Sequence, residues 1–328
     1  MKNREKQMDL DRKYLNKLED VTFVPIFILG IQRSGTSILY KLLSLTNCFN
    51  IVTAYHIIKY NELLHNHING LEEKSKDELN KYFKNEAQHD RGIDRLQINA
   101  DFPEEYGFVI SQKNNQPKLD SENLKTFIEF CKKIQFISRN NKPILLKNPF
   151  DFANFIYIKS VLPNAKFIFI HRNPFKTLNS QLKAMRTLLN QKSKYMALLS
   201  PAYDKVFDNK ILLSYYRFIY SSILPIRVNN AIKNLAETTD YFLENNGSLP
   251  ERECISTKYE DLCEKPELEI EKILTFLNMR SEKHVIYSDF VKTRKTTELK
   301  EIQRKKKFIV KRMNKYIKYC GYNTADIE

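Results

Sequence analysis

The stretch FILGIQRSGTS, residues 27–37, decides the fold. A run of apolar residues that favour β-structure ends at Gly30, and four residues separate it from Gly35. The phosphate loop of nucleotide triphosphatases has this glycine spacing, followed by lysine and then serine or threonine. Here Thr36 stands in the position of that lysine, and the only cation of the loop is Arg33. The pattern therefore predicts a phosphate-binding loop that draws further positive charge from elsewhere in the chain.

The flanking residues place this loop between a strand and a helix. Residues 23–31, FVPIFILGI, are apolar on both faces, which is typical of a buried parallel strand. Residues 37–45, SILYKLLSL, have helical spacing. Backbone N–H groups at the start of such a helix point into one concavity and bind anions. We therefore expect residues 33–37 to hold a phosphate or sulfate group.

Three further buried strands are expected at residues 142–149, 165–174 and 253–262, with helices between them. Strands that alternate with helices of ten or more residues indicate right-handed crossovers and a parallel sheet covered on both faces. The expected fold is α/β: a three-layer arrangement like that of P-loop NTPases, with a central parallel sheet flanked by helices and with helix-rich insertions. One domain over residues 1–328 is the simplest organisation.

The remaining segments are expected to be helical or polar. Residues 1–20 form a polar N-terminal arm or helix, and residues 298–328 form a basic C-terminal helix and tail. Residues 56–141 and 208–246 have mainly helical patterns. A helix is expected to begin at residues 101–103, with Glu104 and Glu105 in its first turn.

The composition limits the possible partners. The net charge of +15 suits nucleic acid, an anionic membrane or a polyanionic small molecule. No nucleic-acid-binding motif is found, and the basic residues are scattered apart from residues 304–307, so a solvated basic surface explains most of them. The N-terminus has no signal-peptide pattern, and the longest apolar run is too short to span a membrane. The five cysteines have no metal-type spacing, which favours reduced thiols in a soluble, cytoplasmic protein.

The strand ends carry cations. Lys147 ends the second strand, and His171 and Arg172 end the third. A triphosphatase has an aspartate at such a strand end to support Mg²⁺. The arrangement indicates an anionic donor that is bound by cations alone, and no metal is expected.

Four segments, taken in order, resemble sulfotransferases that use 3′-phosphoadenosine 5′-phosphosulfate (PAPS), in the bacterial and tyrosylprotein-sulfotransferase-like branch of that family. PIFILGIQRSGTS resembles their 5′-phosphosulfate loop, and LLKNPFDF resembles the segment that supplies a catalytic lysine, here Lys147. HRNPFKTLNS resembles their 3′-phosphate motif, with Arg172 and Ser180. KYEDLCEKPELEIEKILTFL resembles a later segment whose tyrosine, here Tyr259, approaches the nucleotide.

The resemblance implies transfer of a sulfuryl group from PAPS to a hydroxyl or amine of an acceptor, with 3′-phosphoadenosine 5′-phosphate (PAP) as the product. A small-molecule metabolite is the expected acceptor; a glycan, a lipid or a peptide tyrosine are the alternatives. The resemblance gives Lys147 and Arg33 catalytic roles, and residues 305–307 either close over the 3′-phosphate or form a solvated face. The expected nucleotide-binding residues are Arg33, Ser34, Gly35, Thr36, Ser37, Arg172, Ser180 and Tyr259.

Two other functions are compatible with the loop. One is a kinase-like phosphotransferase with a P-loop fold, and the other is a non-catalytic nucleotide-binding protein. The missing loop lysine and strand-end aspartate argue against the kinase. The presence of Lys147, Arg172 and Ser180 argues against a fold that has lost its catalytic groups.

The general base is where the chain departs from the family pattern. Related enzymes often place a glutamate shortly after the loop helix, where this chain has Tyr55 and His56, and cytosolic members have a histidine where this chain has Pro149. His56 is the first candidate, because an imidazole titrates near neutral pH, although it equally suits an ordinary helix position. Glu105 and Glu104 follow as candidates that also suit a helix start, and then Asp151, which also suits a helix cap.

Overall fold

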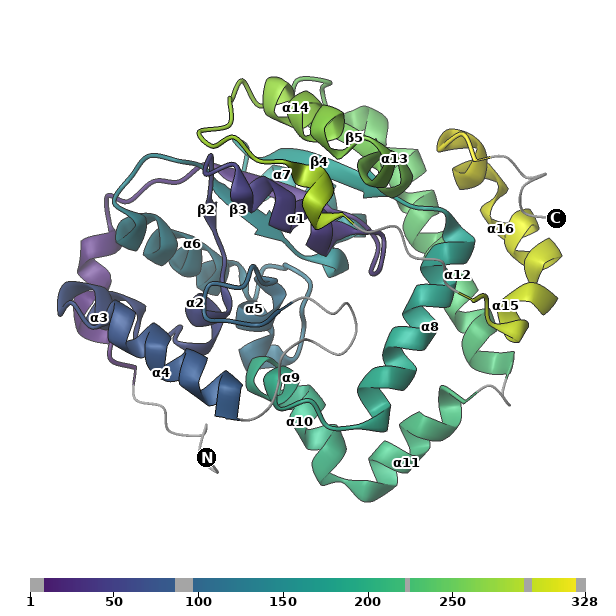
Figure 1. The fold of residues 1–328 in the computed structure, drawn as a ribbon, viewed down its shortest axis with the longest axis horizontal. Helices are drawn as coiled ribbons and strands as arrows, with labels where there is room; N and C mark the ends of the chain where they lie inside the picture. The colour runs from purple at the N-terminus through teal and green to yellow at the C-terminus, as the bar shows by residue number, and fades with distance from the viewer. Residues whose placement is uncertain (1–8, 86–96, 222–224, 292–296, 323–328) are drawn as a thin grey trace.

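The computed structural model describes residues 9–85, 97–221, 225–291 and 297–322. Its centre is a sheet of five parallel strands, which confirms the expected α/β fold (Figure 1). Residues 1–8, 86–96, 222–224 and 323–328, which belong to the expected N-terminal arm, the two expected helical regions and the C-terminal tail, lie outside the described residues. Across the sheet the strands run in the order β2 (Asn50–Ile51), β3 (Ile144–Lys147), β1 (Pro25–Leu29), β4 (Lys166–His171) and β5 (Cys254–Lys258).

The two faces of the sheet bury different kinds of side chain. On β1, Phe27 and Leu29 belong to one core cluster, whereas Ile26 and Ile28 belong to another. This alternation follows from the two-residue period of a strand. The first cluster is rich in phenylalanine and the second in isoleucine and leucine.

Helices cover both faces and complete the three layers (Figure 1). The aliphatic face packs against α1 (Thr36–Leu45) and α14 (Pro266–Phe276). The aromatic face packs against α6 (Leu124–Ser138), α7 (Phe155–Val161) and α12 (Pro225–Asn245). The other elements are η1 (Arg12–Leu18), α2 (Ala54–Ile58), α3 (Leu63–Ile68), α4 (Glu72–Asn85), α5 (Gly107–Asn114), η2 (Pro149–Asn154), α8 (Pro174–Asn190), α9 (Lys194–Leu199), α10 (Pro201–Asp208), α11 (Lys210–Ile219), η3 (Asn246–Ser248), α13 (Tyr259–Glu264), η4 (Tyr287–Phe290), α15 (Lys300–Arg304) and α16 (Lys306–Tyr319).

One expectation from the sequence is wrong in detail. The helix expected to start at residues 101–103 begins only at Gly107, because Pro103 forms an antiparallel bridge with Thr53. Glu104 and Glu105 therefore precede the helix instead of lying in its first turn. The helical pattern expected over residues 208–246 is confirmed in the described part of that range, which contains α11 and α12. The short strand β2 was not expected.

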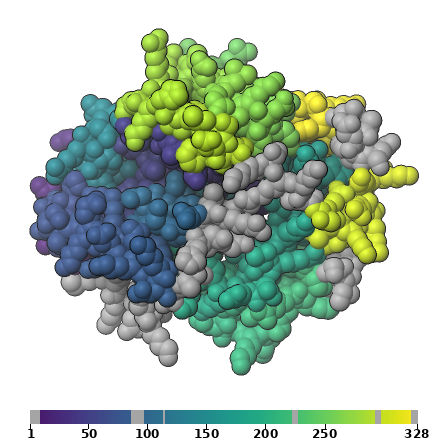
Figure 2. All heavy atoms as spheres, in the orientation of Figure 1, coloured from purple at the N-terminus to yellow at the C-terminus, as the bar shows by residue number. Residues whose placement is uncertain are grey.

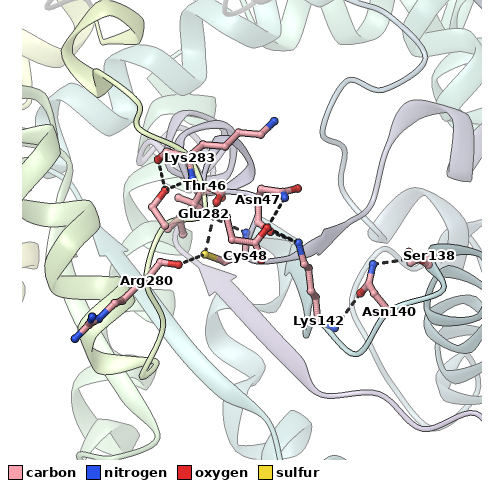
Figure 3. Close-up of polar contacts among 11 residues, drawn as sticks. Thr46, Asn47, Cys48, Ser138, Asn140, Lys142, Arg280, Glu282 and Lys283 are labelled. Atoms are coloured by element: carbon pink, nitrogen blue, oxygen red, sulfur yellow. Dashed lines mark hydrogen bonds and ion pairs between the residues drawn. The ribbon is translucent and has the colours of Figure 1, made fainter.

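Polar contacts fasten the loop after α14 to the edge of the sheet where the strands begin (Figure 3). Lys142, just before β3, donates to Glu282 at 2.8 Å and to the carbonyl of Asn47 at 2.6 Å. The Sγ of Cys48 lies 3.1 Å from the carbonyl oxygen of Arg280. These contacts hold α14 on its face of the sheet, at the edge away from the carboxyl ends of the strands. Among the described residues, no helix has the length and apolar character needed to cross a membrane.

A buried ion pair fastens the N-terminal segment. Asp11, just before η1, is fully buried, and its carboxylate lies 3.0 Å from the Nζ of Lys133 in α6. It also accepts the backbone N–H of His65 at 2.9 Å, and Lys133 makes a second ion pair with Glu129 at 3.0 Å. Removing one partner of a buried pair leaves a charge without full compensation.

Asp11→Asn should therefore lower the free energy of unfolding by about 2–4 kcal/mol. The loss should be smaller than for a lysine left with no carboxylate at all, because Glu129 remains beside Lys133. Urea-induced unfolding measures the change. Asp20→Asn, at an exposed position nearby, is the matched control and should change stability by less than about 0.5 kcal/mol. Equal stability of the two variants would show that the pair does not hold this segment.

Candidate functional site

The carboxyl ends of four strands bring the expected site residues to one edge of the sheet. Residues 30–35 follow β1, Lys147 ends β3, Arg172 follows β4 and Tyr259 follows β5. This edge is where ligands bind in open parallel sheets. The first half of α8 then adds Ser180 beside the loop.

The loop after β1 has the backbone of an anion site. Arg33 has a φ of 72° and Gly35 a φ of 105°, both in the left-handed region. The N–H of Ser34 donates to the carbonyl of Ile31 at 2.9 Å, and α1 begins at Thr36. A turn of this kind directs successive N–H groups into one hollow at a helix start. The left-handed conformation of Arg33 costs on the order of 1 kcal/mol, which is typical of binding sites.

Both loop glycines are required by close contacts. A Cβ on Gly30 would lie 2.5 Å from the Oγ of Ser34 and 2.7 Å from the carbonyl oxygen of Ile170. A Cβ on Gly35 would lie 2.3 Å from the ring of Tyr259. The loop is therefore packed against β4 on one side and against the residue that follows β5 on the other.

Arg172, Ser180 and Tyr259 meet at this loop, as the sequence predicts. Arg172 donates to the carbonyl of Arg33 at 2.7 Å, and its guanidinium carbon lies 4.2 Å from the centre of the Tyr259 ring. The Nε of Arg33 donates to the Oγ of Ser180 at 3.1 Å. Within the described residues, the buried Nε of Arg172 and the Oγ of Ser34 have no hydrogen-bond partner. Two buried polar groups beside the loop thus lack a partner in the described part of the protein, which is uncommon in native structures and suits a region that binds a ligand.

Lys147 links the loop helix to a carboxylate. Its side chain is fully buried, and its Nζ lies 3.1 Å from the Oγ of Ser37 and 3.1 Å from the Oε1 of Glu105. Glu105 is 13% exposed, so it borders solvent. Of the four candidate bases, Glu105 is the one that contacts the strand-end lysine.

Glu104 points away from that contact into the protein. It is fully buried and accepts a hydrogen bond of 2.7 Å from the hydroxyl of Tyr195. Its other oxygen accepts the backbone N–H of Glu105 at 3.1 Å. Tyr195 escaped the sequence analysis, because a contact between residues so far apart in the chain leaves no local pattern.

His56 serves as a helix cap in α2. The ring Nδ1 of His56 accepts the backbone N–H of Thr53 at 3.2 Å. The backbone N–H of His56 donates in return to the Oγ1 of Thr53. The neutral ring then carries its proton on Nε2. Burial lowers the pKa of His56 to about 4, so the ring is neutral at pH 7.

Asp151 is a hydrogen-bonding centre of the interior. Its carboxylate is fully buried and accepts the hydroxyl of Tyr106 at 2.6 Å and the N–H of Leu119 at 2.9 Å. The side-chain amides of Asn148 and Asn154 donate to it as well. Burial raises the pKa of Asp151, and the four donors leave little room for an acceptor.

His171 and residues 305–307 were also considered in the sequence analysis, and each lies in its own surroundings. His171 is buried between the hydroxyl of Tyr316, at 3.0 Å, and that of Ser256, at 3.3 Å. Burial lowers the pKa of His171 to about 4, which suits a structural residue. Residues 305–307 lie where α15 ends and α16 begins. No group of three or more His, Cys, Asp or Glu side chains that could hold a metal ion is found among the described residues.

The model of the sulfotransferase family matches residues 25–283. Two curated relatives, the omega-hydroxy-beta-dihydromenaquinone-9 sulfotransferases Stf3 of Mycobacterium bovis and Mycobacterium tuberculosis, are each 24% identical over 220 residues, which are 58% of this chain. Those residues are 51% of each relative, so the chain spans about half the length of the curated relatives it matches.

Solved structures share the fold at low identity. The crystal structure of sulfotransferase STF9 from Mycobacterium avium aligns with a TM-score of 0.61 and 13% identity, over 94% of this chain and 79% of that one. Sulfotransferase STF1 from Mycobacterium tuberculosis H37Rv aligns with a TM-score of 0.52 and 13% identity, over 92% of this chain and 79% of that one.

The contact between Gly35 and Tyr259 predicts a large effect of a single methyl group. Gly35→Ala should lower the free energy of unfolding by at least about 2 kcal/mol, because it adds a steric clash to the left-handed backbone. Gly70→Ala is the matched control: Gly70 has a φ of 66° but nothing within 4 Å of its added Cβ. Gly70→Ala should lower the free energy of unfolding by about 1 kcal/mol. Urea-induced unfolding measures both.

The double variant Gly35→Ala/Tyr259→Ala separates the steric clash with the ring from the strain of the left-handed backbone. Removing the ring should recover part of the stability that Gly35→Ala loses. If Gly35→Ala costs no more than Gly70→Ala, the ring does not constrain the loop.

Proposed function

The chain belongs to the sulfotransferase family, and we propose that it transfers the sulfuryl group of PAPS to a hydroxyl or amine of a small-molecule acceptor by in-line displacement. The observation that carries this proposal is the group of cations around the loop. Lys147 contacts Ser37 at the start of α1, and Arg172 contacts the carbonyl of Arg33 in the loop. Strands β3 and β4 end in Lys147 and His171, without a carboxylate, which supports an anion site at this edge. Cations and N–H donors stabilise a sulfuryl group without a metal.

The donor is held by two sets of groups. The N–H groups of Gly35, Thr36 and Ser37, together with Arg33, suit the 5′-phosphosulfate. Arg172 and Ser180 suit the 3′-phosphate, and the free Nε of Arg172 supports this role. Tyr259 borders the loop next to Arg172, where it can flank the adenine.

The reaction forms one S–O bond and breaks another. The acceptor oxygen or nitrogen attacks sulfur and gives up its proton to a base, while the bridging oxygen leaves on PAP with the electron pair of the broken bond. Lys147 stabilises the negative charge on that oxygen. Its ammonium already lies beside Ser37 in the loop helix, which supports this role.

We propose Glu105 as the base that takes the acceptor's proton. It contacts Lys147 and borders solvent, so an acceptor can approach it beside the donor. The ring of His56 uses its only lone pair on nitrogen in the cap of α2. The carboxylates of Glu104 and Asp151 are fully buried and accept hydrogen bonds from their neighbours.

The acceptor is proposed to carry a hydroxyl group. The curated relatives are named for an omega-hydroxy menaquinone derivative, which supports an alcohol over an amine. This chain matches only part of those relatives, so its acceptor has to be found by screening. A mass gain of one sulfuryl group identifies it.

PAP should raise the melting temperature by about 5 °C at a concentration one hundred times its Kd, without Mg²⁺, whereas ATP with Mg²⁺ should not. A thermal-shift assay measures both ligands. Arg172→Ala should lose most of the PAP effect, and Arg139→Ala, at an exposed position, should keep it. Stabilisation by ATP with Mg²⁺ but not by PAP would favour the kinase-like alternative.

Glu105→Gln should lower kcat at least about a hundredfold, because the amide cannot accept the proton. His56→Gln should keep kcat within about threefold. Turnover of PAPS with an identified acceptor measures both variants, and the PAP thermal shift serves as the folding control. A large loss in His56→Gln, with normal activity in Glu105→Gln, would reverse the assignment.

A further inference from the structure

Helix α11 presents apolar side chains that the described residues of the chain leave exposed. Seven of the ten residues in its sequence KILLSYYRFI are apolar or aromatic, yet none of them is buried. Ile211 is 84% exposed, and Tyr215 and Phe218 are each 57% exposed. These three residues lie at helical spacing and form one stripe. Single exposed apolar residues are common, but such a stripe indicates a binding surface.

Helix α16 has a buried apolar side and an exposed basic side, whereas α11 exposes its apolar side chains. Its inner side buries Ile309, Met313, Tyr316 and Ile317 against the core. Its sequence contains no acidic residue. Within the described parts of the chain, no carboxylate lies within ion-pairing distance of its exposed cations, which are Lys307, Lys311, Arg312, Lys315 and Lys318.

The two helices adjoin through α8. Arg186 of α8 donates to the carbonyl of Tyr220, at the end of α11, at 2.7 Å. It also pairs with Glu301 of α15 at 2.5 Å, directly before α16. Figure 1 shows α11 at the bottom of the molecule and α15 and α16 at its right, with α8 beside them. Figure 2 shows the yellow residues of α15 and α16 on the right of the surface. The two acidic residues of α10 lie beside Lys192, at 2.7 Å for Asp204 and 3.0 Å for Asp208, and so add little negative charge.

We propose that α11 and α16 dock the protein on an anionic lipid bilayer. The apolar stripe (Ile211, Tyr215 and Phe218) enters the interface between headgroups and acyl chains. The cations of α16 meet the lipid phosphates. Together these residues form what we call the lipid-docking surface.

A bilayer fits this surface better than two other occupants. Nucleic acid neutralises cations but offers little apolar contact to a side chain such as Ile211. A second copy of the chain would bring two basic helices together within a protein of net charge +15, which like-charge repulsion opposes. An anionic bilayer supplies both an apolar layer and negative charge at the same depth.

The test is co-sedimentation of the full chain with vesicles, either of pure phosphatidylcholine or with about 30% phosphatidylglycerol. Only the anionic vesicles should bind, and binding should weaken as salt is raised. Lys307→Gln/Lys311→Gln/Lys315→Gln should weaken binding at least about tenfold. Its matched control is Lys74→Gln/Lys81→Gln/Lys125→Gln, which removes three exposed lysines elsewhere and should bind nearly as well as the wild type.

The apolar stripe needs a variant of its own. Ile211→Ser/Tyr215→Ser/Phe218→Ser should also weaken binding at least about tenfold. Its control is Val24→Ser/Leu268→Ser/Ile286→Ser, at positions 48%, 56% and 54% exposed, which should bind like the wild type. Thermal melting confirms that each variant is folded.

Three results would overturn the proposal: no sedimentation with anionic vesicles; equal losses in the test variants and their controls; or unchanged vesicle binding in the stripe variant. A single-stranded RNA that binds the wild type and the stripe variant equally, while vesicles do not bind, would point to nucleic acid instead. A change from dimer to monomer in the stripe variant, without vesicle binding by the wild type, would point to self-association.

Discussion

The buried ammonium of Lys147 sets the main constraint on this structure. A lysine at the end of a central strand is stable only if polar partners surround it. The register of β3 on β1, which pairs Lys147 with Ile28, places it beside the helix that begins at the loop. Ser37 and Glu105 then supply an oxygen each. The Nζ of Lys147 thus contacts the loop helix through Ser37 and the segment before α5 through Glu105.

The placement of Glu105 shows how tertiary contacts extend this constraint. Pro103 pairs with Thr53 just after β2, and the N–H of Glu104 donates to the carbonyl of Val52 at 2.9 Å. The backbone before Glu105 is thus tied to the sheet instead of entering a helix. Glu104 is turned inward to Tyr195, which leaves Glu105 to face Lys147. The two adjacent carboxylates consequently have different surroundings.

Local patterns in the sequence were enough to predict the four longer strands and the cations at the ends of β3 and β4. Apolar runs with two buried faces, glycines at fixed spacing and cations directly after a strand are all short-range signals, and the positions of Lys147 and Arg172 followed from them, whereas Ser180 was found only through the family resemblance. The proposal of Glu105 over His56 as the base depends on the contact between Glu105 and the distant Lys147, which no local pattern records. The two-residue strand β2 is too short for any periodicity. The cap at His56 did have a signal, because a threonine three residues before a polar side chain is the spacing of a capping box.

The contact between Gly35 and Tyr259 also bears on the order in which the molecule is made. The loop is synthesised before the ring that packs on it, because Tyr259 directly follows β5, more than two hundred residues further along the chain. Arg172, whose guanidinium lies over the same ring, also lacks this contact until Tyr259 has been made. During synthesis the loop therefore lacks the partner that holds its backbone until β5 joins β4. The geometry of the loop is in this sense completed late in synthesis, when Tyr259 has been made and β5 has joined β4, and not when the loop motif itself appears.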